Sequence, residues 1–532
     1  MNSWLKDSVI YQVYPLTFCD SNGDGIGDLK GIESKLDYIK DLGVDVVWLN
    51  PFYPSPFTDG GYDVTDFYGV DPRFGTLDDF NDLVKACKKR GLKIVLDMIP
   101  GHTSWEHPWF KKSAEFEKNE YSDRFIWTDD IFKKYVDKSI HGIFDRNGGY
   151  VVNYYATQPA LNYGFNRLPK NTGVASDGYG GGEDGWKMYY TDERLKPLRE
   201  EIIKILRFWL ARGVDGFRMD CANSLVKECV YNSDKTEDIE GLIWIWDQIF
   251  TPIRKEYPSV AFIAEWIYPK NAVGKAGFDL DFFAHDIVHY NELFRNEPNT
   301  NLTPYFERGH NYFSEAGKGS IKECLKYCDE LYKVCDGKGV FSIPTGSHDQ
   351  VRLAQGMTEN ELKASLAFIF TFKNVPTLYY GDEIGMTHRF SINREGGYIR
   401  TGARTPMQWT NGKNRGFSES DGELYLPVND LAAQSVETQE QDGGSPLNLV
   451  KNLIALRKAH ACLRFGGGLN VISDGYPLIF ERFDENERLL ICINVKKDEY
   501  LVTEAFEEVI FAEGYDETTG ALSCGGVLIV KR

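Results

Sequence analysis

An arginine and an aspartate two residues apart are the first candidates for chemistry in this sequence. Arg218 and Asp220 lie in the stretch GVDGFRMDCANSL, which follows a helix-like segment that ends at Gly213. The stretch begins as a short strand, Val214 to Met219, and side chains two apart on a strand point to the same face. A guanidinium beside a carboxylate favours the ionised carboxylate, which is the form that a nucleophilic aspartate needs. A purely structural Asp–Arg pair is the alternative interpretation of these two residues alone.

Other polar side chains follow the ends of predicted strands in the same way. Strand and helix patterns alternate from Val9–Val13 through Val44–Pro51 and Lys93–Met98, and the alternation resumes after residue 190. It predicts βαβ units with a parallel sheet, and eight such strands predict a closed (β/α)8 TIM barrel of the α/β class. Active sites of such barrels lie at the carboxyl ends of the strands. The candidates at those ends are Asp97, His102, Arg218, Asp220, Glu265, His348 and Asp349.

Three parts are expected along the chain. Residues 1–101 and 191–460 form the barrel. Residues 102–190 are rich in aromatic residues, Gly and Asp and have no lasting period, so they are predicted to form a domain inserted after the third strand, with a Gly-rich insertion at 164–190. Residues 461–532 contain short alternating runs that predict an antiparallel C-terminal β domain, expected to be a sandwich.

A loop near the N-terminus has the spacing of a cation site. The stretch DSNGDGIGDLKGI carries oxygen-bearing side chains at Asp20, Asn22, Asp24 and Asp28, with glycines between them. Closely spaced oxygen ligands in a Gly-rich turn are typical of EF-hand-like loops. With the carbonyl of Ile26, they predict a structural Ca²⁺, or Mg²⁺, far from the chemistry. An acidic surface turn is the alternative, and no organic cofactor is expected.

The composition limits the binding partners and the cellular location that can be expected. The net charge of −19 argues against nucleic acid or an anionic membrane as partner. No apolar run of 18 residues occurs and the N-terminus lacks a basic segment followed by an apolar one, so neither a membrane span nor a signal peptide is expected. The ten cysteines are scattered without a CxxC pair, which favours reduced thiols and a cytoplasmic location. The oligomeric state stays undetermined.

Four motifs carry a resemblance to a known family. They are DMIPGHTS at 97–104, GFRMDCANS at 216–224, IAEW at 263–266 and SHDQ at 347–350. With these motifs the chain resembles the α-amylase superfamily (glycoside hydrolase family 13), over nearly its whole length. The start VIYQVYPLTF, the stretch DGGYDVTDF and the late motif RTGARTPMQW are most similar to the α-glucosidase and oligo-1,6-glucosidase branch.

The resemblance implies a role for each candidate residue. It makes Asp220 the nucleophile, Glu265 the general acid/base and Asp349 the stabiliser of the distorted sugar. We expect Arg218 to keep Asp220 ionised, and burial beside Trp266 to favour the protonated form of Glu265.

The same resemblance implies how the sugar is held. Tyr62 is expected to stack beneath the sugar in subsite −1, and His102 and His348 to hydrogen-bond it. The positions of Asp59 and Arg400 match residues that bind the 4-hydroxyl there, which implies attack at non-reducing chain ends. The small residue after the nucleophile, Cys221, favours α-1,4 or broad linkage specificity.

Three positions depart from the family pattern. Gly101 and Ser347 stand where relatives usually have asparagine before the motif histidines, and Ala160 stands where they usually have aspartate. The catalytic carboxylates are unchanged, so the departures bear on the substrate and not on activity.

The sequence leaves three functional hypotheses. The first is a retaining, exo-acting α-glucosidase that hydrolyses short α-gluco-oligosaccharides or disaccharides. The second is a transglucosidase or a sucrose or maltose isomerase, of the trehalose synthase or isomaltulose synthase type, on the same scaffold. The third, a non-catalytic transporter heavy chain, is disfavoured because it requires a membrane anchor and eroded carboxylates.

Overall fold

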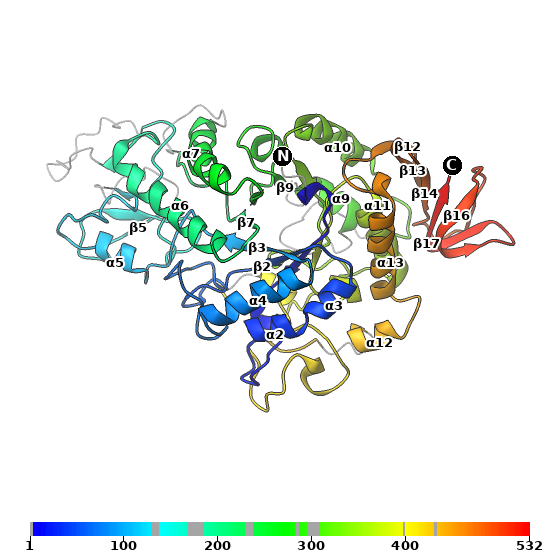
Figure 1. Ribbon diagram of the computed structural model, residues 1–532, viewed down its shortest axis with the longest axis horizontal. Helices are drawn as coiled ribbons and strands as arrows, with labels where there is room; N and C mark the ends of the chain where they lie inside the picture. Colours follow the sequence, from blue (N-terminus) through cyan, green and yellow to red (C-terminus); the bar gives the residue numbers. More distant parts are fainter. Residues whose placement is uncertain are drawn as a thin grey trace.

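Eight parallel strands form the centre of the protein. The computed structural model describes residues 4–128, 138–168, 186–228, 238–283, 287–295, 309–396, 399–429 and 434–532. The strands lie in the order β10-β9-β8-β7-β3-β2-β1-β11 (Figure 1). Their bounds are β1 Ile10–Val13, β2 Val46–Leu49, β3 Lys93–Met98, β7 Gly216–Met219, β8 Ala261–Ala264, β9 Leu280–Phe282, β10 Val340–Ser342 and β11 Thr377–Tyr379.

The two edge strands of this sheet meet and close it. Thr345 N donates to Thr377 O at 2.9 Å, and Val375 N donates to Phe341 O at 3.1 Å. The hydroxyls of Ser342 and Thr377 lie 2.8 Å apart. These bonds join β10 to β11, so the expected (β/α)8 barrel is confirmed.

Strand alternation divides the barrel interior into an apolar and a polar layer. Ile10, Val46 and Val95 belong to a separate buried cluster with partners from β8, β9 and β10. Two residues further along the same strands, on the same face, come Gln12, Trp48 and Asp97. The inward side chains therefore change from aliphatic to mostly polar toward the carboxyl ends of the strands, where the candidate site lies.

The helices between the strands cover the barrel. The longest are α4 Leu77–Lys89, α6 Lys196–Leu210, α7 Glu240–Glu256, α10 Lys322–Cys335, α11 Glu359–Thr371 and α13 Pro446–Ala459. A capping box starts α4, because the Thr76 hydroxyl accepts from Asp79 N while the Asp79 carboxylate accepts from Thr76 N. The segment after the predicted cation loop is divided into α2 Leu29–Ser34 and α3 Leu36–Asp41, since Lys35 leaves helical geometry (φ −104°, ψ 5°).

Two smaller sheets flank the barrel. Between β3 and β7 a three-stranded antiparallel sheet contains β4 Trp127–Thr128, β5 Ser139–His141 and β6 Gly149–Val151. Most of the Gly-rich insertion, 169–185, lies outside the described residues. The antiparallel C-terminal sheet lies at the opposite end of the molecule (Figure 1) and contains β12 Gly468–Asp474, β13 Leu478–Phe483, β14 Arg488–Ile493, β15 Tyr500–Leu501, β16 Glu508–Asp516 and β17 Ala521–Lys531. These strands join into one hydrogen-bonded sheet, whereas the expected sandwich needs two.

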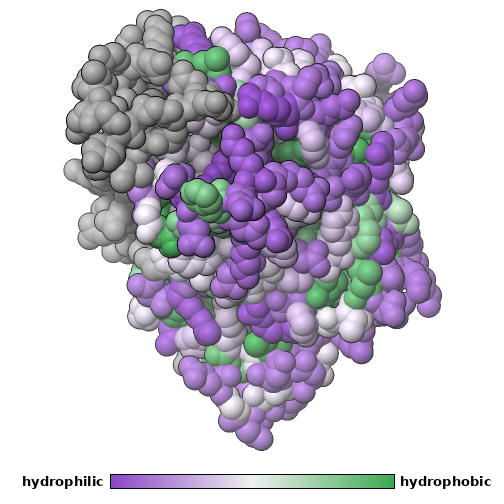
Figure 2. All heavy atoms as spheres, turned by 90° about the vertical axis from the view of Figure 1, so that its left-hand side faces the viewer, coloured by the Kyte–Doolittle hydropathy of each residue, from purple (hydrophilic) through white to green (hydrophobic). Residues whose placement is uncertain are grey.

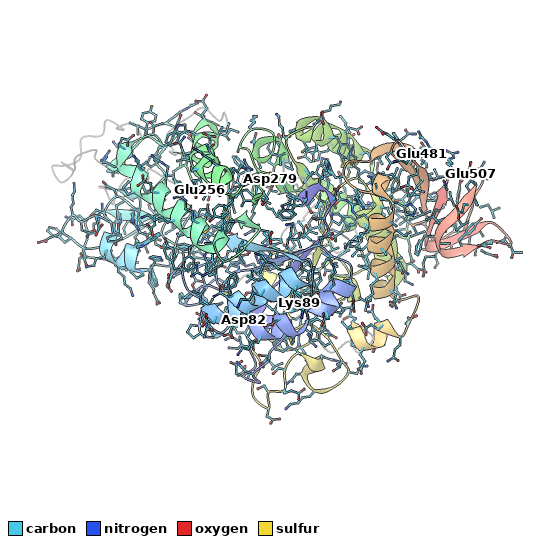
Figure 3. The ribbon with its side chains drawn as sticks, viewed as in Figure 1. Asp82, Lys89, Glu256, Asp279, Glu481 and Glu507 are labelled. Atoms are coloured by element: carbon cyan, nitrogen blue, oxygen red, sulfur yellow. The ribbon has the colours of Figure 1, made fainter. Side chains whose placement is uncertain are left out.

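The outer surface is hydrophilic and charged. On the face drawn in Figure 2, hydrophobic residues form only small, scattered groups. Figure 3 shows Asp82 and Lys89 on α4 and Glu256 on α7, all on helices that cover the barrel. Among the helices that the structure describes, none has the length and apolar character needed to cross a membrane. Most of the charged residues at the barrel mouth are instead buried.

Candidate active site

Arg218 is the centre of the charged cluster at the barrel mouth. It lies in β7 and is 3% exposed. Its Nη1 donates to Asp97 Oδ1 at 2.8 Å and to Asp220 Oδ1 at 2.9 Å, and its Nη2 lies 2.8 Å from Glu265 Oε1. One guanidinium thus holds three carboxyl groups that come from the neighbouring strands β3, β7 and β8 or directly follow them. Arginine suits this position because its planar fork presents several donors in fixed directions.

Asp220 and Glu265 face each other across this guanidinium. Both are buried, and an oxygen of one lies within 4.8 Å of an oxygen of the other. Carboxyl groups of retaining glycosidases lie about 5–5.5 Å apart, whereas inverting enzymes separate them by about 6.5–9.5 Å to admit a water. The spacing of the pair therefore matches retention.

Two buried carboxyl groups this close share a proton. Burial raises the pKa of the Asp220 carboxyl well above its usual range, the charge of Glu265 raises it further, and Arg218 opposes both. The sequence predicts that Arg218 keeps Asp220 ionised, but burial and the charge of Glu265 each affect the pKa of Asp220 more than Arg218 does. Glu265 accepts hydrogen bonds from Arg218 Nη2 and, at 2.8 Å, from Cys221 N, and both donors favour its ionised form. These contacts oppose the protonated form of Glu265 that the sequence predicts.

Cys221 connects the two carboxyl groups through the backbone. Its φ of +44° is unusual for a residue with a side chain, and this turn aims its N–H at Glu265 Oε2. Its thiol lies 3.4 Å from the same oxygen and 3.1 Å from the hydroxyl of Tyr154, a half-exposed residue of the inserted segment. Burial raises the pKa of the thiol well above its usual range, so Cys221 is neutral.

Asp349 lies on the opposite side of the mouth between two arginines. Arg400 Nη1 and Arg404 Nη2 each donate to Asp349 Oδ1 at 2.8 Å, and His348 Nε2 lies 3.0 Å from Oδ2. Burial opposes ionisation, but His348 and the two arginines hold the pKa of Asp349 well below its usual range. Asp349 is therefore a permanent anion, in contrast to the pair around Arg218.

Arg400 also joins Asp349 to Asp59. Its Nη2 donates to Asp59 Oδ1, and Gln158 Nε2 donates to Asp59 Oδ2 at 2.5 Å. Burial raises the pKa of Asp59 to about 6, although Arg400 and Arg404 act against it. The carboxylate and guanidinium that were predicted to act together on the sugar are thus in direct contact.

Tyr62 and His348 form a stacked pair above a polar network. Their rings lie 5.2 Å apart and are nearly parallel. Tyr62 OH donates to Asp97 Oδ2 at 3.0 Å and lies 2.6 Å from His348 Nε2, while Gln12 Nε2 lies 2.9 Å from His348 Nδ1. Because an amide nitrogen can only donate, Nδ1 is the acceptor, and the hydrogen on Nε2 faces both the Tyr62 hydroxyl and Asp349.

His102 is buried with protein partners on both ring nitrogens. Its Nε2 lies 3.1 Å from the Tyr62 carbonyl, and its Nδ1 lies 3.0 Å from Asn153 Nδ2. Burial lowers the pKa of His102 to about 4, so the ring is neutral near pH 7. In this arrangement His102 fixes the backbone of Tyr62, and its predicted contact with sugar stays a prediction.

Asn153 occupies space that the departure at Gly101 leaves open. A Cβ at position 101 would lie 2.9 Å from Asn153 Nδ2. On its other side, Asn153 Oδ1 accepts from Lys227 Nζ at 2.5 Å, and that ammonium also donates to Ser224 O. The inserted segment thereby anchors both His102 and the loop after β7.

Several of these residues were not found from the sequence. Strand alternation could have indicated Gln12 and Asn50, which lie on the inward faces of β1 and just after β2. Arg404 lies within the quoted motif RTGARTPMQW. No sequence signal pointed to the remaining four, which are Tyr154, Asn153, Gln158 and Lys227.

The predicted cation loop packs against residues 417–425. Asp20 accepts from the N–H groups of Asn22, Gly23 and Gly25 and from the Ser418 hydroxyl, and Asp28 caps α2. Its three carboxylates do not converge: within the described ranges, the one group of three His, Cys, Asp or Glu ligand atoms lying within 4.8 Å of one another is Asp220, Cys221 and Glu265. A bound ion would require the loop oxygens to move closer together, and the Ca²⁺ site stays a prediction.

Comparisons with known proteins agree with this architecture. The family model described as "Alpha amylase, catalytic domain" matches residues 12–169 and 187–466. The oligo-1,6-glucosidase of Parageobacillus thermoglucosidasius is 30% identical over 92% of this chain and 90% of its own length. Trehalose synthase/amylase TreS of Mycolicibacterium smegmatis is 32% identical over 87% of this chain and 78% of its own.

A solved structure of similar fold is isomaltulose synthase of Erwinia rhapontici NX5, with a TM-score of 0.80 and 23% identity over 99% of each chain. At that identity the likeness shows the fold alone. The family model covers most of this chain and the oligo-1,6-glucosidase relative nearly all of it. The chain therefore belongs to the α-amylase family of glycoside hydrolases, in the branch of the oligo-1,6-glucosidases and α-glucosidases.

Proposed function

We propose that this protein is a retaining, exo-acting α-glucosidase that removes the glucosyl residue at the non-reducing end of short α-glucosides. The observation that carries the proposal is the close pair of Asp220 and Glu265 held by one guanidinium. Oligo-1,6-glucosidases among the relatives support hydrolysis of short substrates.

The reaction has two steps. In the first, a carboxylate oxygen of Asp220 bonds to C1 of the glucosyl residue while the bond from C1 to the leaving oxygen breaks, and Glu265 gives its proton to that oxygen. In the second, a water attacks C1, Glu265 takes a proton from it, and the bond from C1 to Asp220 breaks. Asp349, a permanent anion, stabilises the positive charge that develops on the sugar ring.

Substrate binding must favour the protonated form of Glu265. The first step needs Asp220 ionised and Glu265 protonated, whereas the donors around Glu265 favour the opposite. A leaving-group oxygen that approaches Glu265 Oε2 takes the place of Cys221 N–H as its partner. Losing a donor favours the protonated form of Glu265.

The pair of Asp59 and Arg400 gives the pocket a closed end. A carboxylate and a guanidinium on the 4-hydroxyl of the sugar leave no room for another glucose attached through that oxygen. Charge-assisted hydrogen bonds are about twice as strong as neutral ones, so a free chain end also gains affinity. This favours attack at chain ends and small products.

The stereochemistry of the first product tests the proposal. Proton NMR of a maltose digest, taken before mutarotation, is expected to show α-glucose in excess of the anomeric mixture that the reducing-end residue of maltose releases. An excess of β-glucose over that mixture would mean inversion and would refute the assigned roles of Asp220 and Glu265.

Transfer to a sugar is the second candidate. It is favoured by the similarity to TreS, which is named a trehalose synthase/amylase. Water and an acceptor sugar compete for the same intermediate, so the two functions share every residue described above. Product analysis with maltose, isomaltose, sucrose, trehalose and kojibiose separates them: free glucose indicates hydrolysis, and an isomeric disaccharide indicates transfer. The same panel tests the expected preference for α-1,4 or broad specificity.

Two further properties are proposed from the sequence. We propose a structural Ca²⁺, or Mg²⁺, in the loop 20–28, supported by the spacing of its oxygen ligands. A cytoplasmic location is supported by the scattered cysteines, and no disulfide occurs among the described ones.

A further inference from the structure

A small cavity lies beside Arg218, next to the catalytic carboxyl groups. It has a volume of about 20 Å³, and one water needs roughly 10–15 Å³. Its walls come from β1, β2, β7 and β9 and from the ends of β8 and β10. The residues that line it are Gln12, Trp48, Arg218, Glu265, Phe282, Pro344, Gly346, Ser347, His348, Asp349 and Gln350.

Three of these lining residues carry a buried polar atom with no hydrogen-bond partner. The atoms are Gln12 Oε1, Trp48 Nε1 and Arg218 Nε. All three side chains are at most 3% exposed. A buried polar group without a partner costs about 1–3 kcal/mol, so three around one cavity require an explanation.

Hydrogen bonding fixes which atom of Gln12 is left without a partner. Asp97 can only accept here, so Asn50 donates to it with Nδ2 at 2.8 Å and presents Oδ1 to its other side. Gln12 Nε2 donates to that Oδ1 at 2.9 Å and to His348 Nδ1 at 2.9 Å. The Gln12 side-chain atom without a partner is therefore the oxygen, Oε1, which needs a hydrogen-bond donor.

The occupant must accept and donate hydrogen bonds at once. Trp48 Nε1 and Arg218 Nε are donors and need an acceptor, whereas Gln12 Oε1 needs a donor. A halide or another aprotic anion only accepts, and it would face the Gln12 oxygen with like charge. A water satisfies all three atoms and matches the volume.

We propose that this cavity is a water site, in which one internal water accepts from Trp48 Nε1 and Arg218 Nε and donates to Gln12 Oε1. The water completes the hydrogen bonds of Arg218, whose other nitrogens hold Asp97, Asp220 and Glu265. It therefore acts as a positioning element for the two catalytic carboxyl groups, through Arg218. Trp48 is a positioning residue, because it contacts the water and the Arg218 guanidinium, whose centre lies 5.5 Å from its ring.

A crystal structure of the full chain, soaked in bromide, tests the site directly. We expect density for one water within about 3.2 Å of all three atoms, with no anomalous bromide signal. An empty cavity, or bromide bound in it, would overturn the proposal. Activity measured at one ionic strength in chloride and in acetate should be equal, since chloride dependence would indicate an anion instead.

The variant Trp48→Phe removes the N–H but keeps an aromatic ring. It is expected to lower kcat/KM about two- to tenfold, which corresponds to the free energy of one hydrogen bond. It is also expected to shift the pH profile of kcat/KM, because Arg218 influences the ionisation of the carboxyl pair. Trp209→Phe is the matched control: its Nε1 donates to Phe67 O in the core near α6, so it is expected to lower Tm without moving the pH profile. A Trp48→Phe profile identical to that of wild type would refute the positioning role.

Discussion

The contact between Gly101 and Asn153 gives the sharpest test of how the inserted segment supports the site. A Cβ at position 101 would lie 2.9 Å from Asn153 Nδ2 and 3.3 Å from Ser224 Oγ. Gly101 is not in the left-handed region, so alanine suits its backbone and the clash is the obstacle. Overpacking of this kind costs about 1–3 kcal/mol, and Gly101→Ala is expected to destabilise the protein by that amount.

Asn153→Ala changes the same contact by removing a side chain instead of adding a methyl group. It removes the partner of His102 Nδ1 and one of the two described acceptors of Lys227 Nζ. Leaving buried His102 Nδ1 unpaired costs about 1–3 kcal/mol, and this is the expected cost because Lys227 keeps its bond to Ser224 O. It also frees the space in which the new methyl group of Gly101→Ala clashes.

The double variant decides whether the two residues interact as described. In the Asn153→Ala background, Gly101→Ala is expected to be neutral or to stabilise by about 0.4–1 kcal/mol, because alanine restricts the unfolded chain. The coupling free energy is then about 1–3 kcal/mol and favourable. It is measured by thermal unfolding of all four proteins, with kcat/KM on maltose as a second readout.

Gly466→Ala is the control, since nothing lies within 4 Å of a Cβ built there and its φ is not positive. It is expected to be neutral in both backgrounds. If Gly101→Ala destabilises equally with and without Asn153, the assigned position of the Asn153 amide beside His102 is wrong.

Four other predictions concern the nucleophile, the loop, the chain end and a buried lysine. Asp220→Asn keeps the shape but removes the attacking charge, so kcat is expected to fall by several orders of magnitude while binding survives; retention of a tenth of wild-type turnover would contradict the role. A chelator is expected to lower Tm more than kcat if the loop 20–28 binds Ca²⁺, because a ligand of the native state adds RT ln(1 + [L]/Kd); purified protein without metal and an unchanged Tm would refute the site. Maltoheptaose labelled at its reducing end is expected to yield glucose and labelled maltohexaose first, whereas early labelled trimers would show internal cleavage. The variant Asp59→Ala is expected to lose most of its kcat/KM on maltose. Burial lowers the pKa of Lys227 from 10.5 to about 8, so the unfolded state binds more protons between these values; stability is expected to rise with pH across that window in wild type and not in Lys227→Met, as followed by Tm.

The alternation of side chains along the strands and the expected barrel topology were sufficient to predict most of the charged residues at the barrel mouth. Asp97, Arg218 and Asp220 occupy alternate positions on or just after strands, and the structure places all three in one hydrogen-bonded cluster. The same rule would have found Gln12, which is inward-facing on β1. Alternation fixes the face of a strand residue, and parallel neighbours bring those faces together.

The supporting partners could not be predicted in this way. Asn153 contacts His102 and Lys227, which are 51 and 74 residues away in sequence, and it lies in a segment without periodicity. No local pattern encodes such contacts, since they depend on how the inserted segment folds over the barrel. The break between α2 and α3 shows a related limit: the apolar spacing on both sides of Lys35 fits one helix, and spacing is insensitive to a single residue that leaves helical geometry.

The proton on the catalytic pair depends on contacts that residue types alone do not specify. From the sequence, Arg218 was assigned to Asp220, and in the structure it bonds Glu265 equally closely. Cys221, through its left-handed backbone, gives Glu265 a second donor, whereas burial and the charge of Glu265 raise the pKa of Asp220. In the proposed mechanism a substrate oxygen replaces this donor, which favours the protonated form of Glu265 when it must act as an acid. Hydrolysis and transfer both begin with that exchange, so the choice between them is made later, by whether water or a sugar next reaches Glu265.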